Sequence, residues 1–160
     1  QLPPSQRGVA MVFQNYALYP HMSVRENMSF GLQNIRMPSQ EIAKRVADAA
    51  RILEIEQLLD RKPAQLSEGE KQFLCIIAVL VMQPAVLVLD EPFSSLDLPT
   101  RRRLEALIAG LPQQVILVAH ELDAFAFYER VIWLHDGKVA MDGAPDAVIA
   151  DYRAFVEAGG

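Results

Sequence analysis

The sequence predicts an α/β fold in which a parallel sheet has helices on both faces. Three runs of apolar residues predict buried strands at residues 9–13, 85–89 and 115–119. Segments with helical spacing of apolar residues separate these runs, and fully apolar strands that alternate with helices are typical of parallel sheets. With 160 residues, 51% of them hydrophobic, the chain is long enough for one such domain.

Helices are predicted by apolar side chains three or four positions apart and by residues that start or stop helices. They span residues 39–53, 67–82, 99–110 and 145–157. Ser39 is a candidate N-cap for the first, and Ser67 with Glu70 has the form of a capping box for the second. The second helix is nearly all apolar, which predicts that it is buried. Near the C-terminal end, Asp136-Gly137 between two apolar runs predicts a tight hairpin.

The stretch from residue 73 to 89 is apolar apart from Gln83 and Pro84, so a membrane span has to be considered. A span needs roughly 20 continuous apolar residues. Pro84 interrupts the run, because proline cannot continue a helix and favours extended geometry in the residue before it. A buried helix followed by a buried strand explains the stretch better.

Composition limits the classes to which the protein belongs. Charged residues make up 22% and the net charge is -5, which argues against disorder and gives no electrostatic reason to expect a nucleic-acid partner. The single Cys75 excludes an internal disulfide and indicates a reducing compartment. The chain opens with polar and proline-rich residues rather than a signal peptide. Because no Met precedes them, we expect the chain to start inside a longer protein.

The sharpest local signal is an apolar strand followed at once by Asp90 and Glu91. The strand delivers both carboxylates to the carboxyl edge of the sheet, where α/β proteins bind ligands. Successive strand residues point in opposite directions, so the two side chains have different roles. One can hold Mg²⁺, directly or through water, while the other polarises a nucleophilic water. The alternative is an ordinary strand end before a turn at Pro92.

Five short motifs follow one another in a fixed order and together span essentially the whole chain. They are Val12-Phe13-Gln14, Leu66-Ser67-Glu68-Gly69-Glu70, Leu89-Asp90-Glu91-Pro92, Ser94-Ser95-Leu96-Asp97 and His120. In this order they resemble the Q-loop, signature, Walker B motif, D-loop and switch histidine of ABC-transporter ATPases. The resemblance implies a P-loop NTPase-type parallel sheet with a helical signature subdomain at about residues 24–82 and a core at 83–160.

The resemblance implies a role for each matching residue in ATP hydrolysis. Gln14 would sense the γ-phosphate and Mg²⁺, and its loop would touch a membrane subunit. Asp90 would help to hold Mg²⁺, Glu91 would be the general base, and His120 would contact the γ-phosphate.

The resemblance also implies contacts across a dimer. Ser67, Gly69 and Glu70 would close over ATP bound to a second protomer, with Asp97 in the dimer seam. A helix N-terminus offers free N–H groups and a positive dipole end to a phosphate, which suits Ser67. The capping box is the purely structural alternative, and both interpretations can hold together.

The phosphate-binding loop of the family is missing from this sequence. No Gly-x-x-x-x-Gly-Lys-Ser/Thr occurs, and the only Gly-Lys pair, Gly137-Lys138, lies in the predicted hairpin. The aromatic platform for adenine is missing too, so truncation at the N-terminus explains the sequence better than a degenerate domain. We then expect the strands that end at Asp90 and His120 to lack a neighbour, and the isolated chain to be inactive.

The signature differs from the family pattern, because Glu68 replaces Gly and Glu70 replaces Gln. A carboxylate near a γ-phosphate weakens binding unless it points away or pairs with a cation such as Lys71. Phe73 stands where a basic residue is usual, so the competence of this signature stays open. Residues 3–32 resemble sugar and glycerol-phosphate importers, whereas the part from about Gln65 onward resembles energy-coupling-factor ATPases for vitamins such as biotin.

The function implied is that of the ATP-binding and ATP-hydrolysing subunit of an importer, peripheral at the cytoplasmic face of the membrane. Its cofactors would be ATP and Mg²⁺, and its partners a second ATPase protomer and transmembrane permease subunits, without nucleic acid. Two alternatives are a soluble ABC-type ATPase of DNA repair or translation and a non-catalytic subunit that completes a partner's ATP site. The apolar and aromatic loop at residues 16–22 favours a protein partner. The transported solute is not readable, because membrane subunits and binding proteins select it.

Overall fold

The protein divides into two compact units. The computed structural model describes residues 8–13, 18–94, 96–125 and 127–159. The first unit is Gln1–Val118 and the second is Ala119–Gly160.

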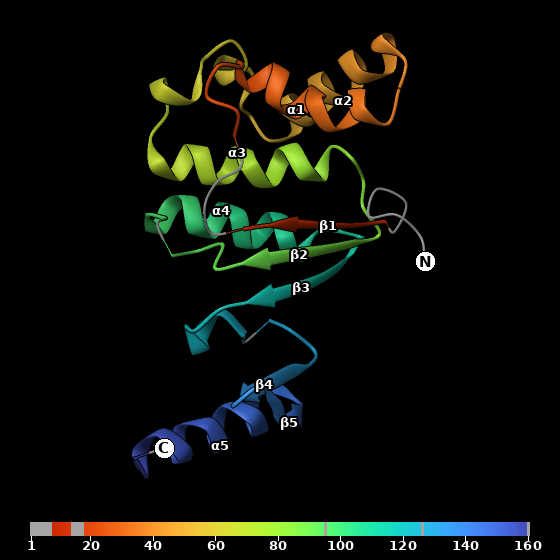
Figure 1. Ribbon diagram of the computed structural model, residues 1–160. Helices are drawn as coiled ribbons and strands as arrows, with labels where there is room; N and C mark the ends of the chain where they lie inside the picture. Colours follow the sequence, from red (N-terminus) through yellow and green to blue (C-terminus); the bar gives the residue numbers. More distant parts are fainter. Residues whose placement is uncertain (1–7, 14–17, 95, 126, 160) are drawn as a thin grey trace. The chain divides into compact units, whose positions relative to one another are not determined.

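The first unit contains a three-stranded sheet (Figure 1). The strands are β1 (Val9–Val12), β2 (Val86–Asp90) and β3 (Gln114–Val118), in that order across the sheet. Both neighbouring pairs are parallel. The parallel sheet predicted from the three apolar runs is therefore confirmed, with each strand within one residue of its predicted bounds.

β2 is the central strand, and its two faces differ in burial. Leu87 and Leu89 are completely buried, whereas Val88 and Asp90 are half-buried. Because side chains alternate along a strand, one face of the sheet points into the core and the other carries Asp90. Our expectation that the strand ending at Asp90 lacks a neighbour is wrong, because β1 and β3 pair with it on its two sides.

The described residues of the first unit form four α-helices, and the first of them was not predicted. Ser23 accepts a hydrogen bond from the Glu26 backbone N–H, and the Glu26 carboxylate accepts one from the Ser23 N–H. These bonds, chiefly the one from the Ser23 backbone, lower the pKa of Glu26. The helices are α1 (Val24–Asn34), α2 (Ser39–Ile52), α3 (Glu68–Leu80) and α4 (Leu98–Ala109), with short 3-10 turns η2 (Glu56–Leu58) and η3 (Pro63–Gln65).

The start of α2 differs from its prediction. Ser39 is the first helical residue rather than the N-cap, and the cap is Pro38, which makes no side-chain hydrogen bond to the helix. Glu41 lies in the first turn and pairs with Arg45 at 3.0 Å. A carboxylate suits the positive end of a helix dipole, so charge supports this helix start in place of a capping side chain.

The middle of α3 is buried, in agreement with the prediction of a buried helix, whereas both of its ends are partly exposed. All residues from Gln72 to Ile77 are buried, and Ile76 and Ile77 are completely inaccessible. The helix contacts α1 and β1 (Figure 1). In the part of the chain that the structure describes, no helix is both long enough and apolar enough to cross a membrane. The apolar stretch from residue 73 to 89 instead forms most of α3 and β2.

The second unit contains an antiparallel hairpin. β4 (Val131–His135) pairs with β5 (Lys138–Gly143), and a 3-10 turn, η4 (Leu122–Phe125), precedes them. Asp136 and Gly137 have φ angles of 49° and 72°. Two consecutive left-handed residues are what a type I′ turn requires, so the hairpin prediction is confirmed.

The last helix, α5 (Pro145–Glu157), has the bounds that the sequence predicts. Trp133 of the hairpin meets Tyr152 and Phe155 of α5 edge-on, at ring-centroid distances of 5.4 and 5.0 Å. Such aromatic contacts fix the helix against the hairpin.

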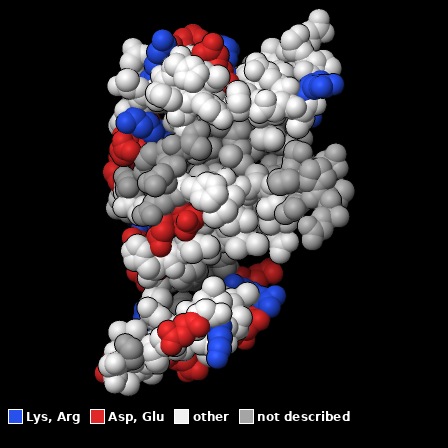
Figure 2. Space-filling model, viewed as in Figure 1, with Lys and Arg blue, Asp and Glu red and all other residues white. Residues whose placement is uncertain are grey.

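On the face seen in Figure 2, Lys and Arg side chains are scattered among Asp and Glu rather than gathered in one patch.

One face of the sheet in the first unit leaves apolar side chains half exposed. Val9, Met11, Ile116 and Val118 are between 43% and 49% exposed. The parallel register brings them to the same face as Asp90. Among the described strands, β3 pairs on one side only. An unpaired edge beside an exposed apolar face favours association between chains.

We therefore expect the isolated 160-residue chain to be molten or to aggregate. Ile116→Lys places a charge on the exposed face of β3 and should reduce self-association in size-exclusion chromatography and light scattering. The control is Ile52→Lys, since Ile52 is 74% exposed at the end of a helix. A sharp, reversible two-state melt of a monomeric wild-type chain would contradict this expectation.

Candidate functional site

Asp90 and Glu91 lie at the carboxyl end of the central strand, as predicted. Asp90 is the last residue of β2 and stands opposite Val118 of β3. Glu91 follows with a φ of 50°, a left-handed conformation that is uncommon for a residue with a side chain. Its N–H donates to the Val118 carbonyl at 2.8 Å. The backbone hydrogen bonding between β2 and β3 thus reaches Glu91 before the chain turns away.

The turn after Glu91 is held by several contacts. Ser94 donates to the Glu91 carbonyl from its backbone N–H at 3.4 Å and from its hydroxyl at 3.1 Å. Phe93 is buried, and the Arg101 guanidinium lies 5.3 Å from the centroid of its ring. Uncommon backbone conformations persist only where the surroundings impose them, and they cluster at functional sites. The fold therefore sets the direction in which the Glu91 side chain leaves the sheet.

The N-terminus of α3 carries the predicted capping box. The Ser67 N–H and hydroxyl donate to the Glu70 carboxylate at 2.7 and 2.9 Å, and the Glu70 N–H donates to Ser67 Oγ at 3.3 Å. Glu68 forms an ion pair with Lys71, with 2.9 Å between Oε2 and Nζ. Both carboxylates of the signature thus have partners in the first turn of the helix: Glu70 bonds to the N-cap Ser67, and Glu68 pairs with Lys71.

Gly69 is not required by the fold of α3. A methyl group at this position would lie 3.6 Å from Leu96 and 3.9 Å from Thr100, which are ordinary contacts. Glycine in a helix costs roughly 1 kcal/mol relative to alanine. A glycine that the backbone geometry does not need leaves room for another molecule to approach the backbone closely.

Asp97 is the N-cap of α4. Its carboxylate accepts a hydrogen bond from the Thr100 N–H at 2.8 Å, and this bond lowers the pKa of Asp97. Leu96 and Thr100 on either side of it are the residues nearest to Gly69. The structure therefore brings the signature and the segment around Asp97 together.

For two predicted site residues, the structure gives no position relative to this group. His120 lies just after β3, in the second unit, whereas Asp90, Glu91 and the start of α3 lie in the first. Gln14 lies outside the described residues. The roles of Gln14 and His120 stay predictions from the sequence.

Asp90 is a candidate ligand for Mg²⁺. Within the described ranges, no three His, Cys, Asp or Glu side chains come together in a way that could hold a metal ion. Mg²⁺ is usually held by one or two carboxylates and takes its other ligands from water and phosphate oxygens. The half-buried carboxylate of Asp90, at the edge of the central strand, fits the protein's share of such a set.

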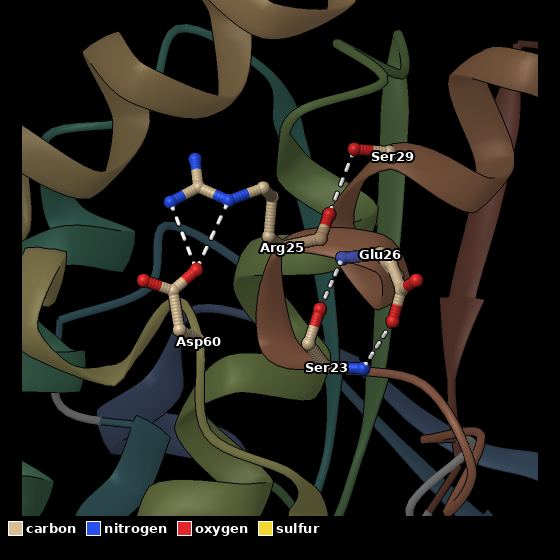
Figure 3. Close-up of polar contacts among 5 residues, drawn as sticks. All are labelled: Ser23, Arg25, Glu26, Ser29 and Asp60. Carbon is tan, nitrogen blue, oxygen red and sulfur yellow. Dashed lines mark hydrogen bonds and ion pairs between the residues drawn. The ribbon is translucent and has the colours of Figure 1, made fainter.

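A groove of about 410 Å³ lies between α1 and α2. Arg25 at its rim is held by an ion pair with Asp60 at 3.1 Å, and the Ser29 hydroxyl donates to the Arg25 carbonyl at 2.7 Å (Figure 3). Ile42 and Val46 are only 8% and 1% exposed, so the apolar strip that is open to a partner is formed by Met37 and Ala43. Such a strip with polar groups beside it is the kind of surface that receives a partner's helix. The apolar lining consists of Met37, Ile42, Ala43 and Val46.

The chain is similar to ATP-binding proteins of import systems. A family model described as ABC transporter matches residues 1–94. The spermidine/putrescine import ATP-binding protein PotA of Nitratidesulfovibrio vulgaris is 46% identical over an alignment of 151 residues, and the match covers 91% of this chain and 41% of PotA. The sn-glycerol-3-phosphate import ATP-binding protein UgpC of Rhizobium meliloti is 44% identical over 90% of this chain and 43% of UgpC.

A solved structure supports the same assignment. The ATP-binding cassette MJ0796, in a dimeric post-hydrolysis state bound to ADP and Pi, matches with a TM-score of 0.77 and 29% identity. The match covers 86% of this chain and 62% of that one. The chain thus spans less than half the length of the two curated relatives. The resemblance that the five motifs indicate is confirmed, and the chain belongs to the ABC transporter family.

Proposed function

We propose that this chain is part of the ATP-binding subunit of an ABC importer, in which ATP hydrolysis is coupled to solute transport. The observation that carries the proposal is the placement of Asp90 and Glu91 at the end of a central parallel strand. The same unit holds the helix that begins at the signature. The similarity to PotA and UgpC, both named as import ATP-binding proteins, supports the coupling to transport.

Each candidate site residue has its own role in ATP hydrolysis. Asp90 and Gln14 would hold Mg²⁺, and Glu91 would accept the proton of the attacking water. His120 contacts the γ-phosphate. Bound ATP and Mg²⁺ supply the phosphoryl group and neutralise its charge, and the protein contributes mainly position and electrostatics.

The N-terminus of α3 serves ATP that is bound by a second protomer. Gly69 presents its backbone N–H group, and Ser67 marks the positive end of the helix dipole that faces the phosphate. Glu70 keeps Ser67 in place as its capping partner, and Asp97 lies in the seam of the dimer. The dimeric form of MJ0796 with ADP and Pi supports this arrangement. No Gly-x-x-x-x-Gly-Lys-Ser/Thr motif occurs in the 160 residues, so we propose that residues outside them supply the loop that binds the phosphates of ATP.

The groove between α1 and α2 is where a membrane subunit docks. It belongs to the helical subdomain that the sequence predicts at about residues 24–82, with the core at 83–160. Its apolar strip accepts the apolar face of a partner helix. This docking places the protein peripherally at the cytoplasmic face of the membrane. The net charge of -5 favours this partner over the nucleic acid of a repair or translation ATPase.

The transported solute lies beyond what this chain specifies. PotA is named for spermidine and putrescine, which are cations, and UgpC for the anion sn-glycerol-3-phosphate. The chain is nearly equally identical to both, at 46% and 44%. Other subunits therefore select the solute.

ATPase assays on the full-length encoded protein test the proposed function. Glu91→Gln and His120→Ala should each lower the rate by about 10²-fold or more, as the loss of a base or of a charge-stabilising contact does. Glu56→Gln, an isosteric change in the exposed turn η2, is the control and should leave the rate unchanged. The isolated 160-residue chain should show no ATP binding by calorimetry.

Three outcomes of these assays would count against the proposal. Full turnover in Glu91→Gln or His120→Ala would remove that residue from the chemistry. Micromolar binding of ATP by the isolated chain would show that the chain contains a phosphate-binding site of its own. A full-length protein that binds no ATP, yet raises the ATPase rate of a partner, would replace the proposal by the non-catalytic alternative.

Crosslinking tests the docking groove. Cysteine placed at Ala43, which lines the groove, or at the exposed Tyr19 should crosslink to a membrane subunit in the assembled transporter. The single native Cys75 is buried, so the background is low. Cysteine at the exposed Val156 of α5 is the control. Crosslinks at Val156 as strong as those at Ala43 would refute the groove as the docking site.

A further inference from the structure

Gln72 is a polar side chain buried within the apolar helix α3. It is only 3% exposed, between neighbours that are mostly apolar. Its amide nitrogen donates to the Pro92 carbonyl at 2.6 Å and to the Glu91 carbonyl at 3.3 Å. Polar groups in a protein interior are retained when they are hydrogen-bonded, and here the partners lie on the turn that carries the candidate base.

The Glu91 carbonyl is the point at which this turn is fixed. It accepts from Gln72 and also from the N–H and the hydroxyl of Ser94. Glu91 itself has the left-handed φ of 50°. Rotation of the Glu91–Pro92 peptide would change where the Glu91 carboxylate points. A side chain that holds both carbonyls therefore limits the direction of the carboxylate.

The same face of α3 also touches the next part of the chain. Gly69 and Gln72 are three positions apart and so lie on one side of the helix. Gly69 faces Leu96 and Thr100, while Gln72 reaches Glu91 and Pro92. One helical turn thus connects the signature with both ends of the segment from residue 91 to 100.

We propose that Gln72 is a positioning residue for ATP hydrolysis: its amide holds the Glu91 turn in the conformation that aims the carboxylate, and it links this turn to the signature helix. The inference rests on the proposed function, in which Glu91 is the base. Gln72 itself touches neither substrate nor reacting atoms. Its effect is transmitted through the backbone of Glu91 and Pro92.

Kinetics of the full-length encoded protein test the inference. Gln72→Met keeps the length of the side chain and removes the donor. It should lower kcat about 10-fold or more, because a small misplacement of a catalytic group is costly. KM for ATP should change little, because other groups bind the nucleotide. Gln72→Glu, which puts an acceptor where the donor was, is a second variant of the same shape and should show the same loss.

A matched control is available in the same chain. The amide of Gln57 also donates to a carbonyl, that of Glu54 at 3.1 Å, but at an exposed position. Gln57→Met should leave kcat unchanged. Circular dichroism of each variant verifies that the protein is folded at the assay temperature.

A double-mutant cycle separates positioning from general support of the fold. If Gln72 acts through Glu91, Gln72→Met should have little further effect on the single-turnover rate once Glu91→Gln is present. An equal loss in both backgrounds, or an unchanged kcat in folded Gln72→Met and Gln72→Glu, would overturn the inference and leave the proposed function intact. A full-length protein without ATPase activity, or full activity in Glu91→Gln, would overturn both.

Discussion

The burial of α3 on all sides is the constraint on which the first unit depends. Its residues from Gln72 to Ile77 are at most 4% exposed, so other elements have to cover each side of this part of the helix. α1 covers one side and β1 another. A helix enclosed in this way is fixed along its axis, and so is the signature at its N-terminus. The side-chain amide of Gln72, within this buried part of the helix, donates to the Pro92 carbonyl in the turn after the central strand.

Most of the fold could be predicted because apolar runs and end signals act locally. β1, β2 and β3 follow from continuous apolar residues, and α3 from the same property together with its capping box. The bounds of α5 follow from Pro145 in its first turn and from the spacing of apolar residues after it. Two helix starts differ from the prediction. The sequence of Ser23 and Glu26 fits the capping box that begins α1, a helix that we did not predict. Ser39 has the chemistry of an N-cap but lies inside its helix.

Long-range relations could not be read from the sequence. The order of the strands places β1 and β3 on either side of β2, although 73 residues separate the end of β1 from the start of β2. Local patterns carry no information on such pairing. Gln72 bonds to carbonyls 19 and 20 residues further along the chain. A side-chain amide buried in an apolar helix is expected to have a hydrogen-bond partner, but the sequence does not say which residue that partner is. Asp90 and Glu91 could be found as candidate site residues because strand position and motif coincide there.

Hydrogen–deuterium exchange on the full-length protein tests most directly whether α3 is the fixed element of the first unit. Amides exchange slowly where opening exposes much buried surface, and their protection approaches the global stability in the core. The amides of Leu74 to Ile77 should exchange more slowly than those of α2, whose buried residues form a single stripe. Exchange of the α3 amides as fast as that of α2 would contradict the account.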